Sequence, residues 1–277
     1  MSVRRRFLPQ GWYPLEAEDT ADAIRAMSRS LPRRSEGHGV AGVVPHAGWE
    51  FSGCIALEVM SSLSRSIDTI VIIGGHLGPS DGILCSLEDS FDTPLGPMEA
   101  DAKLRDALLV SFPMQGDRCA DNSVEVQLPF AKYLFPDARV LGLRASPSQQ
   151  AIRLGAAIAS AVKATGQAVA VIGSTDLTHY GPNYGFCPAG KGDKARTWVT
   201  DINDRRIIEA MTALDCASVL ELAAGERSAC SAGGALCAMS FAREIGIRRG
   251  QLLRYMTSYD VHPAESFVGY AGILYGQ

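Results

Sequence analysis

The chain has 277 residues, of which 47% are hydrophobic and 20% are charged, and its formal net charge is −4. This apolar content excludes a disordered chain and is enough for one large domain or two small ones. The negative net charge provides no electrostatic basis for binding nucleic acid, so we expect no such partner.

Segments with helical and strand periodicity alternate along the chain. In chain order we predict a helix over residues 16–30, a strand over 39–45, a helix over 52–63, a strand over 69–75, helices over 101–110 and 123–130, a strand over 139–143, a helix over 148–165, a strand over 168–173, helices over 191–212, 217–223 and 231–245, and strands over 252–260 and 267–275. This alternation indicates a mainly parallel sheet flanked by helices. The connection over residues 261–266 is too short for a crossover, so the last two strands should pair antiparallel. We therefore predict an α/β fold with a mixed, mainly parallel central sheet, and a single domain over residues 1–277, since there is no internal repeat or linker.

Neither secretion nor membrane insertion is indicated by the sequence. The basic run Arg4-Arg5-Arg6 is followed by Phe7-Leu8-Pro9, which is unlike the apolar region of a signal peptide. No uninterrupted apolar stretch is long enough to span a bilayer, so we expect a cytoplasmic protein that does not contact membranes. The seven cysteines are scattered and include no C-x-x-C pair, which argues against a disulfide framework and a zinc ribbon. We expect most of them to be buried thiols.

Three of the predicted strands lead directly to a histidine. The strands over residues 39–45 and 69–75 are followed by His46 and His76, and the strand over 168–173 is followed by a short loop that ends at His179. The chain has only five histidines, so this repeated setting is informative. In open α/β sheets, ligands and catalytic groups collect where parallel strands end. The pattern predicts one site built from three strand ends, with imidazoles suited to metal binding or proton transfer.

Each of these residues also has a simpler interpretation. His46 could be a loop histidine bonded to backbone groups. The glycines before His76 are similar to a phosphate-binding loop, but no complete nucleotide motif is present. Asp176 lies three residues before His179 and could orient that imidazole for acid–base chemistry, or it could cap the following turn.

A thiol and a further histidine complete the candidates. Cys230 precedes the helix predicted over residues 231–245, where the positive end of the helix dipole favours a thiolate. It could be a metal ligand, a nucleophile or a buried structural thiol. His262 lies in the loop between the last two strands and is either a surface turn residue or a residue that contacts substrate.

An ordered series of motifs resembles the Memo family, which includes the AmmeMemoRadiSam system protein B group. The matching segments cover nearly the whole chain and are Gly11-Trp12-Tyr13-Pro14, Pro45-His46-Ala47-Gly48-Trp49, Thr93-Pro94-Leu95-Gly96, Ser123-Val124-Glu125-Val126-Gln127-Leu128-Pro129-Phe130 and Ser174-Thr175-Asp176-Leu177-Thr178-His179-Tyr180-Gly181. Thr257-Ser258 and Val268-Gly269-Tyr270 match the family's C-terminal elements.

The resemblance implies a fold like that of the class III extradiol dioxygenases. Carried onto this sequence, it implies that His46, His76 and Cys230 bind a metal and that Asp176 and His179 are the catalytic acid–base pair. Two histidines with an anionic third ligand suit iron(II), whereas a thiolate makes copper(I) a competitor, and zinc is a further alternative. By the same analogy we expect a small-molecule or peptide ligand, with radical-SAM and AMMECR-type proteins as partners.

Three segments depart from the family pattern. The second-histidine loop is Gly74-Gly75-His76, one residue shorter than the family's G-P-[NS]-H. Asp121-Asn122-Ser123 replaces the family's E-H-S, so a pocket histidine is missing, and Cys230-Ser231 replaces C-G. These changes indicate a divergent member whose substrate differs.

Three functional hypotheses follow from these residues. The first is a mononuclear non-heme metal enzyme that carries out redox chemistry on a small organic substrate. The second is a non-catalytic metal-binding or peptide-binding scaffold that has kept a dioxygenase-like cleft. The third is a metal-free hydrolase in which Cys230 is the nucleophile and His179 the base.

Overall fold

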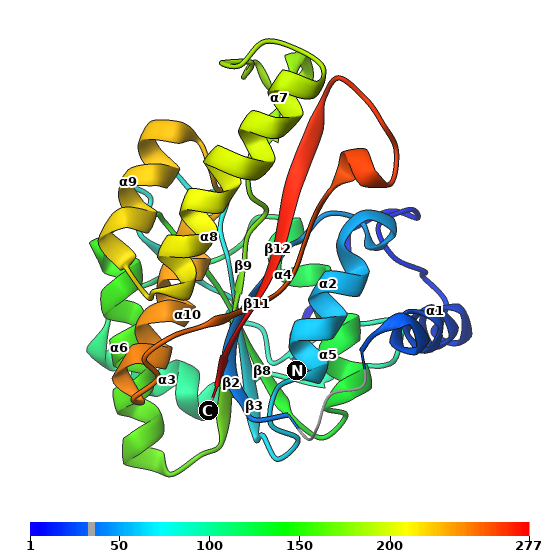
Figure 1. Ribbon diagram of the computed structural model, residues 1–277. Coiled ribbons are helices and arrows are strands. Elements are labelled where there is room, and N and C mark those ends of the chain that lie inside the picture. The colour runs from blue at the N-terminus through cyan, green and yellow to red at the C-terminus, as the bar shows by residue number, and fades with distance from the viewer. Residues whose placement is uncertain (33–36, 277) are drawn as a thin grey trace.

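A nine-stranded mixed sheet forms the centre of the protein in a computed structural model that describes residues 1–32 and 37–276 (Figure 1). The strand order is β10-β12-β2-β9-β3-β8-β4-β7, with β11 paired to β12 outside this path. The strands are β2 (Gly39–Val44), β3 (Thr69–Gly74), β4 (Ile83–Cys85), β7 (Gln115–Gly116), β8 (Arg139–Ala145), β9 (Val169–Ser174), β10 (His179–Tyr180), β11 (Gln251–Thr257) and β12 (Phe267–Gly276). A separate small sheet has the order β1-β5-β6 and is formed by β1 (Val3–Arg4), β5 (Ser90–Phe91) and β6 (Met98–Glu99).

The four central strands β2, β9, β3 and β8 are parallel, so their carboxyl ends lie at one edge of the sheet. The strand β12 pairs antiparallel with β2, β10 and β11, and β4 pairs antiparallel with β8. The predicted fold class, a mixed sheet flanked by helices, is confirmed. The short strands β1, β4, β5, β6, β7 and β10 were not predicted, because segments of two or three residues carry no recognisable periodicity.

Helices cover both faces of the sheet (Figure 1). One face carries α3 (Ala102–Ser111), α6 (Gln149–Thr165), α8 (Asp204–Thr212), α9 (Cys216–Glu226) and α10 (Ala232–Glu244). The other face carries α1 (Ala17–Ser30), α2 (Trp49–Ser61) and α5 (Leu128–Leu134). The remaining helices are α4 (Asn122–Glu125) and α7 (Asp193–Trp198), with single 3-10 turns over Pro182–Tyr184 and Ser258–Asp260.

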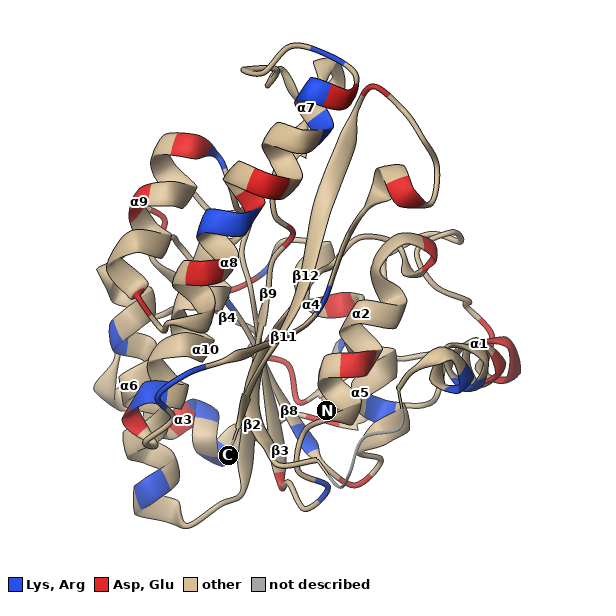
Figure 2. Ribbon diagram, viewed as in Figure 1, with Lys and Arg blue, Asp and Glu red and all other residues tan. Residues whose placement is uncertain are grey.

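The sheet separates two hydrophobic cores. In β3, Val71 and Ile73 pack into the core beneath α6 and α10, whereas Ile70 and Ile72 pack into the core beneath α2 and α5. Burial on both faces explains the continuous apolar runs of the central strands. Figure 2 shows the result: β2, β3, β9 and β12 carry no charged residue.

Several helix boundaries differ from the prediction for identifiable reasons. The helix predicted from Ser52 begins at Trp49, and the Ser52 hydroxyl donates to the carbonyl of Ala47 instead of capping the helix. The helix predicted over residues 123–130 is divided into α4 and α5, because Pro129 has no N–H group and is accommodated at the start of α5. The helix predicted over 191–212 contains a π-helical turn over Val199–Asn203 between α7 and α8.

The cysteines are less buried than predicted. All seven are free, but only Cys85, Cys216 and Cys237 are buried. Cys119 and Cys187 are exposed, so the prediction that most would be buried is wrong. Within the described ranges, no helix combines the length and the apolar character that a membrane span requires.

Candidate metal centre

His46 follows β2 and is held from several directions at the carboxyl edge of the sheet. Its backbone N–H donates to Asp176 Oδ1 (2.7 Å), and its carbonyl accepts from Asn122 Nδ2 (3.0 Å). Its ring Nδ1 lies 3.2 Å from Ser174 Oγ, and Gln127 Nε2 donates to the carbonyl that precedes His46 (2.7 Å). The side chain is 2% exposed. With Nδ1 engaged and the loop fixed, Nε2 is the ring atom left to face the site.

His76 follows β3, and its backbone adopts the left-handed conformation with φ of 57°. This conformation is uncommon for a residue with a side chain, and it turns the short Gly74-Gly75-His76 loop sharply back over the strand end. The backbone N–H of His76 donates to Ser231 Oγ (3.1 Å), and ring Nδ1 lies 2.9 Å from Asp121 Oδ2. The shortened loop therefore still brings the imidazole to the edge of the sheet beside His46.

Cys230 lies two residues before α10 and reaches the same edge from the opposite direction. Its N–H donates to the carbonyl of Asp176 (3.1 Å), and its Sγ lies 3.2 Å from His46 Nε2. The hydroxyl of Thr175 is 3.9 Å from the same sulfur atom. Strand β9 lies between β2 and β3, so its end, Ser174-Thr175-Asp176, forms the floor of the site.

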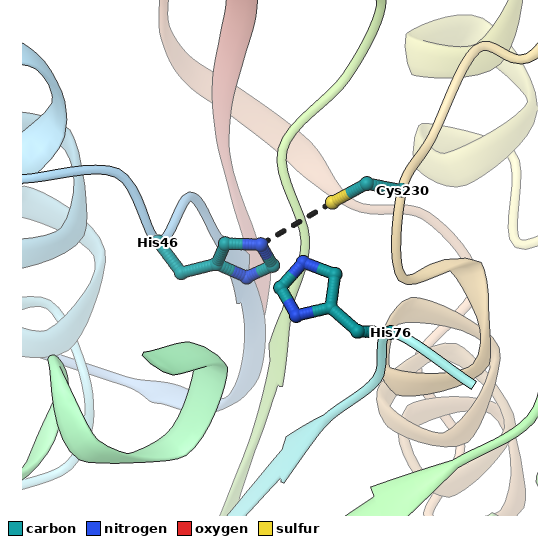
Figure 3. A group of neighbouring side chains, drawn as sticks. All are labelled: His46, His76 and Cys230. Atoms are coloured by element: carbon teal, nitrogen blue, oxygen red, sulfur yellow. Dashed lines mark hydrogen bonds between the residues drawn. The ribbon is translucent and has the colours of Figure 1, made fainter. Parts of the chain in front are cut away.

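One ligand atom from each of His46, His76 and Cys230 lies within 4.8 Å of the others (Figure 3). Figure 3 shows the three side chains pointing toward one another from two strand-end loops and from the segment before α10. Two imidazoles and a thiol are a donor set that suits transition metals such as iron, copper and zinc. The residues present thus fit a metal ion, and the nitrogen that His76 turns toward Asp121 is the outward contact that metal-binding histidines commonly make.

The His76–Asp121 pair is strongly polarised. Two hydrogen bonds of the His76 ring raise its pKa to about 9. The bond to Asp121 has the larger effect, and the bond to Cys230 the next largest. Burial would raise the pKa of Asp121, but hydrogen bonds from His76 and Ser123 hold it at about 2. Arg144 contacts the same carboxylate at 3.3 Å and is itself paired with Asp117 at 2.8 Å. Without metal, His76 therefore carries a proton at neutral pH.

His179 lies in β10, and its ring is 4.9 Å from that of Tyr184. Burial lowers the pKa of His179, and the nearby Asp176 charge opposes this effect. Over residues 1–32 and 37–276, no hydrogen bond joins the Asp176 carboxylate to the His179 ring; its Oδ1 accepts from the backbone of His46 instead. The two predicted catalytic residues thus lie in one site and interact through charge.

A cleft of about 530 Å³ opens beside these side chains. Its walls include His46, His76, Asp176 and His179 together with aromatic residues. The aromatic residues are Trp12, Phe51, Tyr184 and Tyr270. His262 also borders the cleft, where its Nε2 lies 2.8 Å from Glu50 Oε1 on α2. The candidate metal centre is therefore open to a small ligand.

Comparison with known proteins identifies the family of the chain. Residues 8–274 match the family model described as Memo-like protein. The chain belongs to the Memo family. It is 34% identical to a MEMO1 family protein of Thermococcus onnurineus, over 99% of each chain, and 32% identical to one of Methanopyrus kandleri, over 95% of each. A crystal structure of an uncharacterized protein from Escherichia coli K12 aligns with a TM-score of 0.55 and 12% identity, over 85% of this chain and 99% of that one, which shows a shared fold only.

The Memo family motifs contribute supporting residues that the sequence alone did not assign. Gln127 and Asn122, from the segment around α4, hold the His46 loop, and Asn122 stands where the family pattern has a histidine. Ser174 contacts His46, and Asp121 contacts His76. The motif over residues 121–130 was the signal in the sequence that could have pointed to Asp121, Asn122 and Gln127. The residues that they contact, at positions 45, 46 and 76, are too distant in the sequence for the motif to reveal.

A buried carboxylate beneath the His179 segment was also missed. Asp204 follows the π-helical turn and accepts hydrogen bonds from the N–H of Thr178 (3.1 Å) and from Tyr255 Oη (2.8 Å). Complete burial raises its pKa to about 7. Asn203 donates to Thr178 Oγ1 (2.8 Å), so two consecutive residues fix the position next to His179. No motif in the sequence pointed to them.

Proposed function

We propose that this Memo family protein binds one metal ion through His46, His76 and Cys230 and carries out redox chemistry on a small organic substrate in the adjoining cleft. The observation that supports this most directly is the cluster of three ligand atoms within 4.8 Å at the carboxyl edge of a largely parallel sheet. Three protein ligands leave further positions on a metal open to substrate. A bound metal would supply Lewis-acid and one-electron chemistry at that point.

We favour iron(II) as the ion, with copper(I) as its main competitor and zinc as a further alternative. Related sites with two histidines and a carboxylate bind iron(II), whereas the thiolate of Cys230 makes this site softer. Two further residues of the chain, His179 and Asp176, would assist the reaction. His179, whose pKa is lowered by burial, is a neutral base at pH 7 and can accept a proton from a substrate hydroxyl. Asp176 would hold the His46 loop and stabilise positive charge that develops on His179.

Metal analysis of anaerobically purified protein tests the proposal. We expect close to one equivalent of iron, copper or zinc per chain, and almost none in His46→Ala and Cys230→Ala, since each substitution removes a ligand. Matched controls are His38→Ala and Cys187→Ser, which change an exposed histidine and an exposed cysteine outside the cluster and should retain the metal. Equal metal content in the two site variants and their controls would overturn the proposal.

Turnover separates the enzyme from a scaffold. We expect sustained oxygen consumption by the metal-loaded protein with an organic substrate, for which aromatic diols are the first screen. Metal binding without any turnover would favour the scaffold. The hydrolase that pairs Cys230 with His179 has less support, because the imidazole at 3.2 Å from the sulfur belongs to His46.

A further inference from the structure

The cleft beside the candidate metal centre has no Lys or Arg among its described lining residues. Asp176 is one of these lining residues. The only basic group within ion-pair distance of Asp176, among the described residues, is His46 at 3.9 Å. A carboxylate or phosphate group on a ligand would therefore lose its hydration without gaining a charged partner, which is unfavourable.

The metal centre itself would not compensate for this absence. A divalent ion adds two positive charges, and the Cys230 thiolate and Asp176 together add two negative ones. The neighbouring charges also pair among themselves, because Arg144 contacts both Asp121 and Asp117. With neutral imidazoles, the loaded site carries no net positive charge that could attract a distant anionic group of the ligand.

Three cations that bond to residues in or next to the cleft walls are already engaged. Lys191 lies 3.3 Å from Glu265, and Arg196 lies 2.8 Å from Asp260. Arg227 donates to the carbonyls of Tyr184 and Gly185, and its guanidinium stacks over a phenylalanine ring at 4.9 Å. None of these three side chains lines the cleft.

An acidic groove adjoins the cleft. Trp12 lines both spaces, and the groove beyond it is lined by Glu16, Asp19 and Glu50 without a Lys or Arg among its described lining residues. Acidic segments at the N-terminal ends of α1 and α2 are visible in Figure 2. The approach to the metal centre is thus acidic as well, which favours cationic ligands during encounter.

We infer that the cleft selects an uncharged or cationic ligand with a planar apolar body and excludes ligands that carry a carboxylate or phosphate away from the metal. The aromatic walls formed by Trp12, Phe51, Tyr184 and Tyr270 suit a flat ring, and the absence of Lys and Arg from the lining beside Asp176 sets the charge preference. This inference rests on the proposed function for the position of the ligand's metal-binding group. It further implies that phosphorylated peptides are not ligands of this cleft.

Calorimetric titration with a pair of catechols of matched shape and opposite charge tests the inference. Dopamine and 3,4-dihydroxyphenylacetate carry the same diol on the same ring and differ in the sign of the remote charge, and 4-methylcatechol is the neutral reference. Zinc-loaded protein keeps the measurement free of redox turnover. We expect dopamine to bind about tenfold more tightly than 3,4-dihydroxyphenylacetate, with 4-methylcatechol between them, since the nearby carboxylates attract one and repel the other.

A cation introduced on the cleft wall should weaken this preference. Ala264 lines the cleft and is exposed in the loop before β12, so Ala264→Lys should fold normally, and Ala264→Gln is its uncharged control. We expect the lysine variant to narrow the preference about fivefold, because a unit charge at roughly 8 Å attracts the anion and repels the cation by similar amounts even at the dielectric of water. The glutamine variant should leave the preference unchanged.

The outcomes separate this inference from the proposed function. Equal or tighter binding of 3,4-dihydroxyphenylacetate, an unchanged preference in Ala264→Lys, or no binding of any catechol would overturn the charge selection while leaving the metal site intact. In metal-free protein the protonated His76 adds a positive charge to the cleft of every variant, so there the comparison is between Ala264→Lys and Ala264→Gln, which share that charge. Failure to take up metal would thus count against the proposed function alone, and the difference in preference between Ala264→Lys and Ala264→Gln in metal-free protein would still decide the inference.

Discussion

At the scale of single residues, His76 is the ligand candidate whose protonation is most strongly controlled. Its Nδ1 lies 2.9 Å from Asp121 Oδ2, and this contact raises the pKa of His76 to about 9. The pKa of Asp121 is lowered to about 2, so its carboxylate is ionised at neutral pH. Arg144 and Asp117 extend this pair into a buried chain of alternating charges. The second nitrogen of His76 is therefore held toward His46 and Cys230 in one orientation.

This raised pKa predicts that metal affinity increases with pH. When the pH is below the His76 pKa of about 9, the ring holds a proton that the metal must displace. Metal binding is therefore weaker the further the pH lies below that pKa. From this proton alone we expect the apparent affinity to rise about tenfold per pH unit between pH 7 and pH 9, and to level off above it. Competition titrations with a chromophoric chelator, corrected for the chelator's own protonation, measure the slope.

Asp121→Asn is the control that isolates the His76 proton. It keeps the Oδ1 atom that accepts from the N–H of Ser123 at the start of α4, but it removes the charge beside His76. The pKa of His76 should then fall toward its ordinary value, and the slope between pH 7 and pH 9 should become shallower. A proton that the Cys230 thiol releases on binding metal contributes to the slope of both the wild-type protein and Asp121→Asn, so it does not affect the comparison. Identical slopes would show that Asp121 does not control the ring.

At the scale of elements, the π-helical turn before α8 positions the His179 segment. The turn over Val199–Asn203 brings Asn203 and Asp204 to the same side of the chain, where both contact Thr178. Strand β12 completes this packing, because Gly269 accepts from Leu177 N–H (2.8 Å) and donates to the Thr178 carbonyl (3.0 Å). A helix, a strand and the loop after β9 thus meet next to the proposed base.

Gly269→Ala tests this junction. A Cβ atom at this position would lie 1.8 Å from Asp204 Oδ2, so the carboxylate would have to move and release Thr178. We expect a loss of about 1–3 kcal/mol in the free energy of unfolding, as is typical of overpacking. Chemical denaturation measures this loss.

A double-mutant cycle provides the control for Gly269→Ala. In an Asp204→Ala background the clashing oxygen is absent, so the alanine at position 269 should cost much less than in the wild-type protein. An equal cost in both backgrounds would mean that the glycine is required for another reason, such as its pairing with β11.

Sequence periodicity predicted the elements that depend on local pattern and missed those that depend on distant partners. The central strands and the histidines at their ends were predictable because buried parallel strands are continuously apolar. The contacts of Asp121 with His76 and of Asp204 with Thr178 join residues that are 45 and 26 positions apart, and no local pattern encodes them. The split at Pro129 is different, since this residue is visible in the sequence and its missing N–H group disfavours the interior of one continuous helix over residues 123–130.

At the scale of the whole molecule, α10 connects the sheet to the candidate metal centre. The helix packs against β2, β3 and β9 and against α6, and its residues 232–242 are buried. Gly234 lies against the backbone of two strands, where a Cβ atom would approach Ile73 O at 2.3 Å and Ser174 N at 3.1 Å. These strand positions immediately precede the loops that carry His76 and Asp176. The distance between helix and sheet therefore sets the distance between Cys230 and the two histidines.

Gly234→Ala should consequently weaken both the fold and the metal site. The added methyl group would push the first turn of α10 away from the sheet and carry Cys230 with it, since backbone atoms cannot move aside as a flexible side chain can. We expect a loss of about 1–3 kcal/mol in the free energy of unfolding and, in the protein that remains folded, a fall of about tenfold in metal affinity. Gly225→Ala in α9 is the matched control, because no atom lies within 4 Å of its Cβ position, and it should leave metal affinity unchanged. If Gly234→Ala lowered stability but bound metal as tightly as Gly225→Ala, the position of Cys230 would be set by its own loop, through its N–H bond to Asp176, and not by the packing of α10.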